Sequence, residues 1–96
     1  MGFEWDARKN AANLAKHGID FEDAIAVFDG PTLERIDTRR DYGEIRIAVI
    51  GAANNRVLYL AYTPRGENRR IISARKANEQ ECESYRQAYP RFASAG

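Results

Sequence analysis

The chain lacks most of the residues that build metal centres and disulfides. Its 96 residues include one cysteine and one histidine, which excludes an internal disulfide and gives no zinc-type ligand set. The Gly-rich loop that cradles phosphates and the Gly-x-Ser-x-Gly turn of serine hydrolases are also missing. We therefore expect no metal and no other cofactor.

Long apolar runs are missing as well. The longest is far shorter than the about 20 residues of a membrane helix. The first residues, Met1-Gly2-Phe3-Glu4, have neither the basic start nor the apolar stretch of a signal peptide. We expect a reduced, cytoplasmic protein with no membrane partner.

What the chain does have is enough apolar residues for one small core. Its hydrophobic share is 44%, and 15 Lys and Arg against 14 Asp and Glu give a net charge of +1. We expect a single domain over residues 1–96, with a loose tail from about residue 91. Residues 65–76 hold five cations and one anion, whereas residues 79–83 hold three anions and no cation. This sorting predicts a basic patch on a nearly neutral molecule.

The first helical pattern covers residues 7–17. Asp6 precedes it as an N-cap, and Gly18 follows it as a left-handed stop. Its apolar residues share one face, as expected for the side that packs on a core. These residues are Ala7, Ala11, Leu14 and Ala15.

Two more helical patterns follow. Asp20 caps one that runs to about residue 28, before the breaking sequence Asp29-Gly30-Pro31. Asn78 caps the other, with Glu81 in the capping-box position. Pro90 is expected to end this last helix.

Between these helices the apolar pattern changes to the period of β-strands. A brief strand is expected at residues 3–5, and longer ones at 32–36, 44–51, 56–63 and 69–75. A polar loop at 37–43 and turns at 54–55 and 64–68 join the later strands. Short connections favour an antiparallel meander. We predict an α+β fold in two layers, with a small antiparallel sheet of three to four strands against two N-terminal helices and one C-terminal helix.

The strand from Arg70 to Arg75 has an apolar centre and an arginine at each end. A phosphate is the natural counter-charge, because a guanidinium binds phosphate oxygens in a bidentate way. In a regular strand Arg70 and Arg75 have opposite parity and point to opposite faces. Both can serve one site only if the strand bulges, or if one lies at an edge and wraps round.

Cations and aromatic residues near these strands suit RNA chemistry. Cleavage needs no metal when the ribose 2′-hydroxyl is the nucleophile, because histidine or glutamate can transfer the protons. Arginines neutralise the phosphate, and aromatic rings stack on splayed bases. The residues of this kind are Lys16, His17, Arg46, Arg65, Arg70 and Arg75, with Tyr42 and Tyr62.

Each candidate also has a purely structural interpretation. His17 ends the first helix, where an imidazolium gains from the helix dipole and can bond the last carbonyls. Arg75 can pair with Glu79 or Glu81 instead of a phosphate. Glu44 and Arg46 can form a solvated surface pair.

Several segments together resemble the BrnT family of bacterial toxins. They cover residues 3–86, and the two most specific motifs are Lys16-His17-Gly18 and Arg70–Arg75. The others are Phe3-Glu4-Trp5-Asp6, Phe21 with Val27-Phe28-Asp29, Gly43-Glu44-Ile45-Arg46, Thr63-Pro64-Arg65-Gly66, and Glu81 with Tyr85.

The resemblance implies a RelE-like fold and a metal-independent endoribonuclease, the toxin of a type II toxin–antitoxin system, which cleaves RNA and inhibits translation. It implies neutralisation by a cognate BrnA-like antitoxin in a toxin–antitoxin hetero-oligomer, which binds operator DNA through the antitoxin. By position, the catalytic residues it implies are His17, Glu44, Arg65 and Arg75, and the RNA- or phosphate-binding residues are Lys16, Arg46 and Arg70. Pro64 departs from the family pattern and puts the position of Arg65 in doubt.

Two other functions stay open on the sequence alone. One is a non-catalytic interaction module, a corepressor bound to a DNA-binding partner. The other is a direct nucleic-acid binder, which the low net charge and the lack of an Arg- or Asn-rich recognition helix disfavour.

Overall fold

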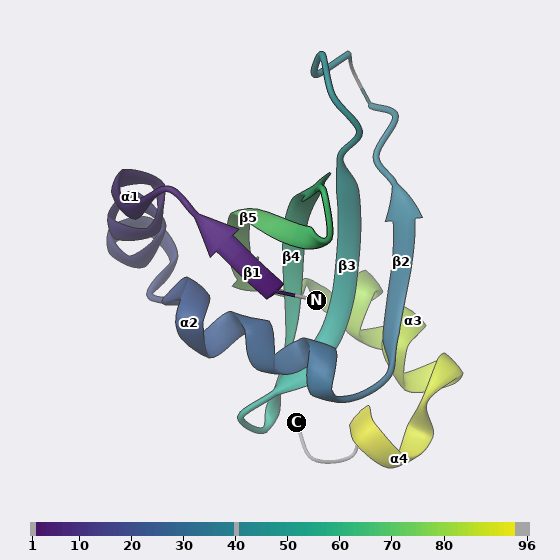
Figure 1. Ribbon diagram of the computed structural model, residues 1–96. Coiled ribbons are helices and arrows are strands. Elements are labelled where there is room, and N and C mark those ends of the chain that lie inside the picture. Colours follow the sequence, from purple (N-terminus) through teal and green to yellow (C-terminus); the bar gives the residue numbers. More distant parts are fainter. Residues whose placement is uncertain (1, 40, 94–96) are drawn as a thin grey trace.

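The structure is a computed structural model that describes residues 2–39 and 41–93 (Figure 1). A five-stranded sheet forms its centre, in the order β1-β5-β4-β3-β2. The strands are β1 (Gly2–Trp5), β2 (Thr32–Ile36), β3 (Ile47–Ala53), β4 (Arg56–Arg65) and β5 (Asn68–Lys76). The predicted α+β class is confirmed.

Strands β2 to β5 form the predicted antiparallel meander, and β1 adds a fifth strand parallel to β5. The prediction of three to four antiparallel strands is therefore wrong in number and direction. The missing strand has a physical reason, because Gly2 pairs with Asn68, which is far away in the sequence. No local pattern reveals a partner that distant.

The helices are α1 (Ala7–His17), α2 (Phe21–Ala24), the 3₁₀ helix η1 (Ile25–Asp29), α3 (Glu79–Ala88) and α4 (Pro90–Ala93). Asp6 caps α1, and Asn78 with Glu81 forms the predicted capping box of α3. Residues 91–93 belong to α4 and not to a loose tail, because Pro90 suits the first position of a helix. Residues 94–96 lie outside the described residues.

Helices cover both faces of the sheet, so the fold has three layers and not the predicted two (Figure 1). On one face η1 approaches β3 so closely that a Cβ on Gly51 would lie 2.8 Å from Cβ of Val27. On the other face α3 buries Tyr85, whose hydroxyl donates to the carbonyl of Pro31 at 2.9 Å. The main core lies on the η1 side and includes Phe21, Val27, Val49, Leu60 and Ile71.

Helix α1 packs with its polar face inward, opposite to the prediction. Asn13 is buried, whereas Leu14 on the predicted inner face is 46% exposed. The Asn13 amide bonds to both backbone groups of Ala74, accepting from its N–H at 3.1 Å and donating to its carbonyl at 2.8 Å. The Asn13 amide thus replaces a neighbouring strand for the part of the β5 edge that β1 does not cover. Because the Ala74 backbone groups need these partners, α1 turns its Asn13 side towards the sheet.

Candidate active site

The β4–β5 ladder contains a bulge that decides where the arginines of β5 point. Ala61 pairs with Ser73 and Tyr62 pairs with Ile71, so Ile72 is an extra residue without a partner. Arg70 therefore lies opposite Thr63, and Arg75 lies opposite Tyr59. Thr63 and Tyr59 are four residues apart on β4 and share a face. Arg70 and Arg75 consequently share the face that α3 partly covers.

Arg75 is held in one position by two contacts. Its Nη1 and Nη2 donate to Oε1 and Oε2 of Glu81, both at 2.9 Å. Its guanidinium carbon lies 4.1 Å from the centre of the Tyr59 ring, in a cation–π contact. Nη1 also donates to the carbonyl of Lys76 at 3.1 Å. This leaves the Nε edge of the guanidinium for a further acceptor.

The pair keeps its charges over a wide pH range. Hydrogen bonding to Glu81 raises the pKa of Arg75 further above neutrality. Burial by itself would raise the pKa of Glu81, but the hydrogen bonds from Arg75 and from the Asn78 backbone outweigh it and lower that pKa. Glu81 is therefore a carboxylate at neutral pH, fixed by α3 as well as by Arg75.

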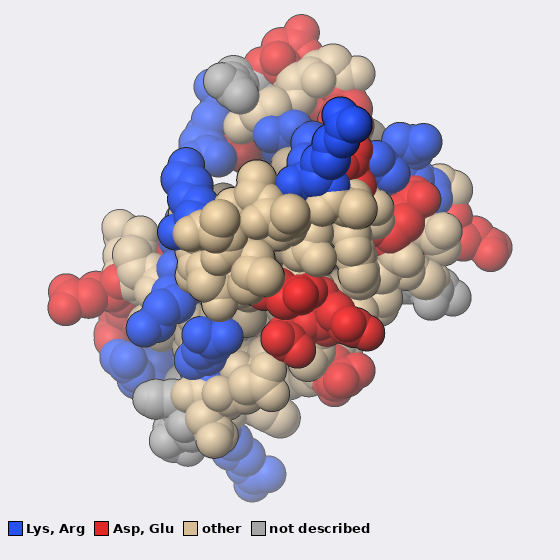
Figure 2. Space-filling model, turned by 90° about the vertical axis from the view of Figure 1, so that its left-hand side faces the viewer, with Lys and Arg blue, Asp and Glu red and all other residues tan. Residues whose placement is uncertain are grey.

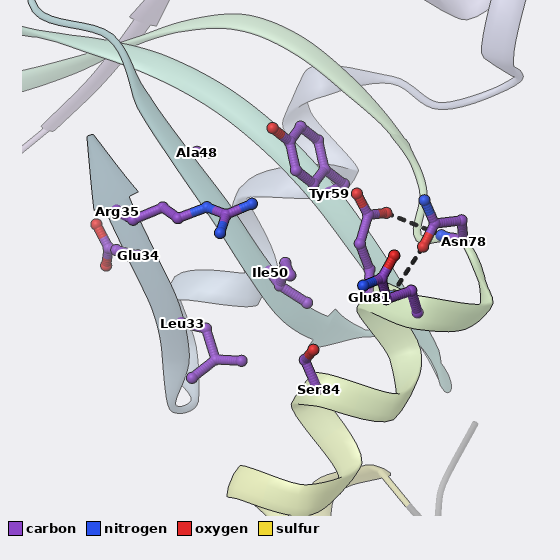
Figure 3. Close-up of a pocket in the computed structure, with 10 residues that line it drawn as sticks. Leu33, Glu34, Arg35, Ala48, Ile50, Tyr59, Asn78, Glu81 and Ser84 are labelled. Carbon is purple, nitrogen blue, oxygen red and sulfur yellow. Dashed lines mark hydrogen bonds between the residues drawn. The ribbon is translucent and has the colours of Figure 1, made fainter. Parts of the chain in front are cut away.

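Two adjoining hollows between β2 and α3 form one groove on this face (Figure 3). Arg35, Ala48, Tyr59 and Glu81 line both hollows. We call the hollow with Arg75 the arginine end; its other residues are Ile36, Asp37, Thr38 and Arg39. We call the other the deep end, about 270 Å³ in volume, with Leu33, Glu34, Ile50, Asn78, Gln80 and Ser84.

Three arginines from separate elements meet at the arginine end: Arg35 of β2, Arg39 of the β2–β3 loop and Arg75 of β5. Arg39 donates from Nη2 to Oδ2 of Asp37 at 2.8 Å. That hydrogen bond holds the pKa of Asp37 far below its usual range. The Arg35 side chain is exposed and makes no hydrogen bond to another described residue. The end thus presents positive charge that its own carboxylates only partly neutralise.

The structure places Glu44 and Arg46 in the β2–β3 loop and not in a strand. The predicted strand at 44–51 starts only at Ile47. One further backbone hydrogen bond, from Asp37 N–H to the Arg46 carbonyl at 2.7 Å, lies just beyond the paired residues. The Nη2 of Arg46 lies 3.9 Å from Oε1 of Glu44, and its guanidinium stacks at 3.8 Å over Tyr42. Neither Glu44 nor Arg46 is among the residues that line the groove.

Arg70 and Arg65 lie on the face of the groove but further along it. Arg70 is opposite Thr63, about 13 Å along β4 from Tyr59, and Arg65 is about 20 Å away. The Nη1 of Arg70 lies 4.0 Å from Oε2 of Glu4. Pro64 stays in β4, so Arg65 pairs with Asn68 and the turn shrinks to residues 66–67. Arg75, Arg70 and Arg65 thus form a row along one face of the sheet and not one cluster.

His17 and Lys16 lie away from the groove, at the end of α1. His17 is half-buried one turn after Asn13, on the helix side that meets the edge of β5. Lys16 is exposed. Figure 2 views the molecule from this side, where basic and acidic side chains gather in separate areas around an uncharged centre. The cations of residues 65–76 do not form one patch, because Arg65, Arg70 and Arg75 share one face of the sheet and Arg69 lies on the other.

Sequence reasoning missed Arg35, Arg39 and Tyr59. The strand period offered a signal for Tyr59, because it lies between Leu58 and Leu60, which are buried on the other face. The sequence offered no signal for Arg35 and Arg39, since their position beside Arg75 depends on the order of the strands and on the course of the β2–β3 loop. Tyr62 was grouped with the cations, but its ring packs against Phe28 in the core and its hydroxyl donates to Glu34 at 2.7 Å.

Two other kinds of site were sought in the described residues. No group of three or more His, Cys, Asp or Glu side chains there is placed to hold a metal ion. No helix in that part of the chain is long and apolar enough to cross a membrane.

The fold is a small α+β domain with a five-stranded sheet, and three arginines meet at one end of its groove. Comparison with known proteins gives the family. The family model described as ribonuclease toxin, BrnT, of type II toxin-antitoxin system matches residues 5–81. The chain therefore belongs to the BrnT family of ribonuclease toxins.

A solved structure gives independent support. The crystal structure of the Brucella abortus ribonuclease toxin, BrnT, at 1.1 Å resolution, is similar to this chain with a TM-score of 0.62 and 30% identity. The similarity covers 82% of this chain and 99% of that one. A comparison with curated proteins found no match.

The chain is thus a toxin-family endoribonuclease of a bacterial type II system, and such a system implies a cognate antitoxin. Family membership decides against a purely non-catalytic module.

Proposed function

We propose that the groove is the active site of a metal-independent endoribonuclease, in which the ribose 2′-hydroxyl attacks the adjacent phosphate. The observation that carries the proposal is the convergence of Arg35, Arg39 and Arg75 at one end of the groove. Charge on the phosphate rises in the transition state, and preorganised donors stabilise it without a metal.

Arg75 is the residue that binds the scissile phosphate. Glu81 and the Tyr59 ring hold its guanidinium still, so little entropy is lost when an acceptor arrives. Its Nε edge is the part left for that acceptor. Arg70 and Arg65 bind neighbouring phosphates of the same strand, because they follow Arg75 along one face at about 13 and 20 Å.

Three groups are candidates for proton transfer. His17 and Glu44 have suitable chemistry but do not line the groove, whereas Tyr59 does. Lys16 and Arg46 are assigned to binding the RNA outside the groove. The variants His17→Ala, Glu44→Gln and Tyr59→Phe separate the three candidates, because only loss of the true acid or base removes one limb of the pH–rate profile.

The wider biology follows from the activity. Cleavage of RNA in the bacterial cytoplasm inhibits translation, and a cognate BrnA-like antitoxin neutralises the toxin in a hetero-oligomer. The complex binds operator DNA through the antitoxin alone. The family description supports the toxin role and the antitoxin partner.

The test is cleavage of a single-stranded RNA by the purified chain, made by cell-free synthesis, with and without EDTA. We expect equal rates in both, and products that end in a 2′,3′-cyclic phosphate. A rate abolished by EDTA and restored by a divalent cation would contradict the metal-independent mechanism. In cells, expression should stop growth, and expression of the neighbouring antitoxin should restore it.

A further inference from the structure

The deep end of the groove is a separate compartment beside the arginine end. Its apolar lining is Leu33 from β2 and Ala48 and Ile50 from β3, beside Glu34 and Arg35 of β2. The opposite wall is α3, which presents Gln80 and Ser84 (the latter drawn in Figure 3). At about 270 Å³ the compartment is just below the about 300–1,000 Å³ of pockets that bury drug-sized ligands. It suits one flat ring and not a length of chain.

The side chains of Gln80 and Ser84 have polar groups that can bind a ligand. They are four residues apart on α3 and so share one face of the helix. Within the described residues no side-chain hydrogen bond is recorded for either, unlike Gln87 on the same helix, whose amide donates to Glu83 at 3.3 Å. An amide and a hydroxyl beside apolar side chains are the groups that read the edge of an unstacked base.

The compartment is continuous with the proposed phosphate site. Tyr59 and Arg35 line both ends, and in Figure 3 the Arg35 side chain extends from β2 across the hollow towards Tyr59. A nucleotide whose phosphate meets Arg35 and Arg75 therefore has its own base within reach of the deep end. The geometry fits a nucleotide, in which an anion and a flat ring are adjacent.

We propose that the deep end binds one unstacked base of the RNA next to the scissile phosphate, and that Gln80 and Ser84 select which base it accepts. This inference rests on the proposed ribonuclease site, and it assigns the residues that determine sequence preference. Leu33 and Ile50 give affinity without selectivity, because apolar contact does not distinguish the bases. Selection comes from the hydrogen bonds of α3 to the edge of the base.

The test measures cleavage preference on an RNA pool with random sequence. The purified protein should prefer one or two bases beside the cut. Gln80→Ala and Ser84→Ala should each reduce that preference by about tenfold, the size of one lost hydrogen bond, while total cleavage continues. Ser84→Leu fills the compartment and should remove the preference. Gln87→Ala, a matched change on the same helix outside the groove, should keep it.

Other outcomes decide against the inference. Cleavage without base preference, or a preference unchanged in all three groove variants, would overturn it and leave the ribonuclease site standing. Variants that weaken only antitoxin binding would show that the deep end takes a protein segment. If the protein cuts no RNA, the proposed function fails first. NMR signals of Gln80 and Ser84 that shift on titration with nucleoside monophosphates would then sustain the base site, and unmoved signals would overturn it.

Discussion

Arg70 and Arg75 lie on the same face of strand β5, although they are five positions apart and a regular strand would put them on opposite faces. The unpaired Ile72 makes the difference, because one extra residue restores the parity. The bulge therefore puts Arg70 and Arg75 in one row with Arg65, on the face of the sheet that carries the groove. Arg69, next to Arg70, points the other way and stacks at 4.4 Å on the ring of Phe28.

The row predicts how salt affects RNA binding. Replacing Arg70 by Ala should lower the slope of log K against log salt by about 0.7, the value for one lost phosphate contact on a single strand. Fluorescence anisotropy with a non-cleavable 2′-deoxy strand gives the slope. An unchanged slope would mean that Arg70 pairs with Glu4 and contacts no phosphate.

The neighbouring arginine supplies the matched control. Arg69→Ala should leave the salt slope unchanged but lower the free energy of unfolding by about 1–2 kcal/mol, because its guanidinium packs on aromatic rings. If the two variants behave alike in both measurements, the assignment of opposite faces is wrong.

Asn13 should be a large contributor to stability for a polar residue. Asn13→Ala removes two hydrogen bonds to the buried Ala74 backbone and one to the Ile19 carbonyl. We expect a loss of at least about 2 kcal/mol, because the backbone groups stay buried without partners. Urea unfolding measures it. The exposed Lys9→Ala on the same helix should change stability by less than about 0.5 kcal/mol; equal effects would refute the role given to Asn13.

The Arg75–Glu81 pair predicts a specific pH dependence. The pKa of Glu81 is lower in the folded protein than its ordinary value of 4.5. The unfolded chain therefore takes up the proton first as pH falls, and the stability from Glu81 is present above that value and lost below it. The free energies of unfolding of wild type and Glu81→Gln should differ most well above the ordinary value, and the difference should shrink as pH falls below it. The low pKa of Asp37 affects both proteins equally and cancels.

A constant difference between the two proteins across that range would show that Glu81 acts through its shape and not its charge. Glu81→Gln keeps one acceptor oxygen for the Asn78 N–H, so the capping box of α3 can still form and the comparison tests the charge alone.

The parts of the fold that sequence predicted are those with local causes. Asp6, Gly18 and the Asn78–Glu81 box mark helix ends through contacts within a few residues. Asn54 and Asn55 make the predicted turn, with positive φ angles of 53° and 64°. Residues 56–63 are rich in Val, Leu and Tyr, and the strand forms there between two antiparallel neighbours that bury it on both faces.

The parts that sequence did not predict depend on distant partners. The apolar stripe of α1 suggested the wrong inner face, because a buried hydrogen-bond requirement at Ala74 outweighed about four small apolar side chains. No residue near Ile72 indicates in the sequence that the strand has a bulge there. Arg75 was found from its charge beside an apolar strand, whereas Arg35 and Arg39 join it only through the order of the sheet.

The central claim is that Arg75 binds the scissile phosphate in the groove, and RNA cleavage by Arg75→Ala tests it most directly. Loss of one preorganised donor should cost roughly 2.7–4 kcal/mol of barrier, so the rate should fall at least about a hundredfold. Arg86→Ala, which removes an arginine paired with Glu83 on the outer side of α3, is the control and should cleave normally. A folded Arg75→Ala protein with wild-type cleavage would contradict the account.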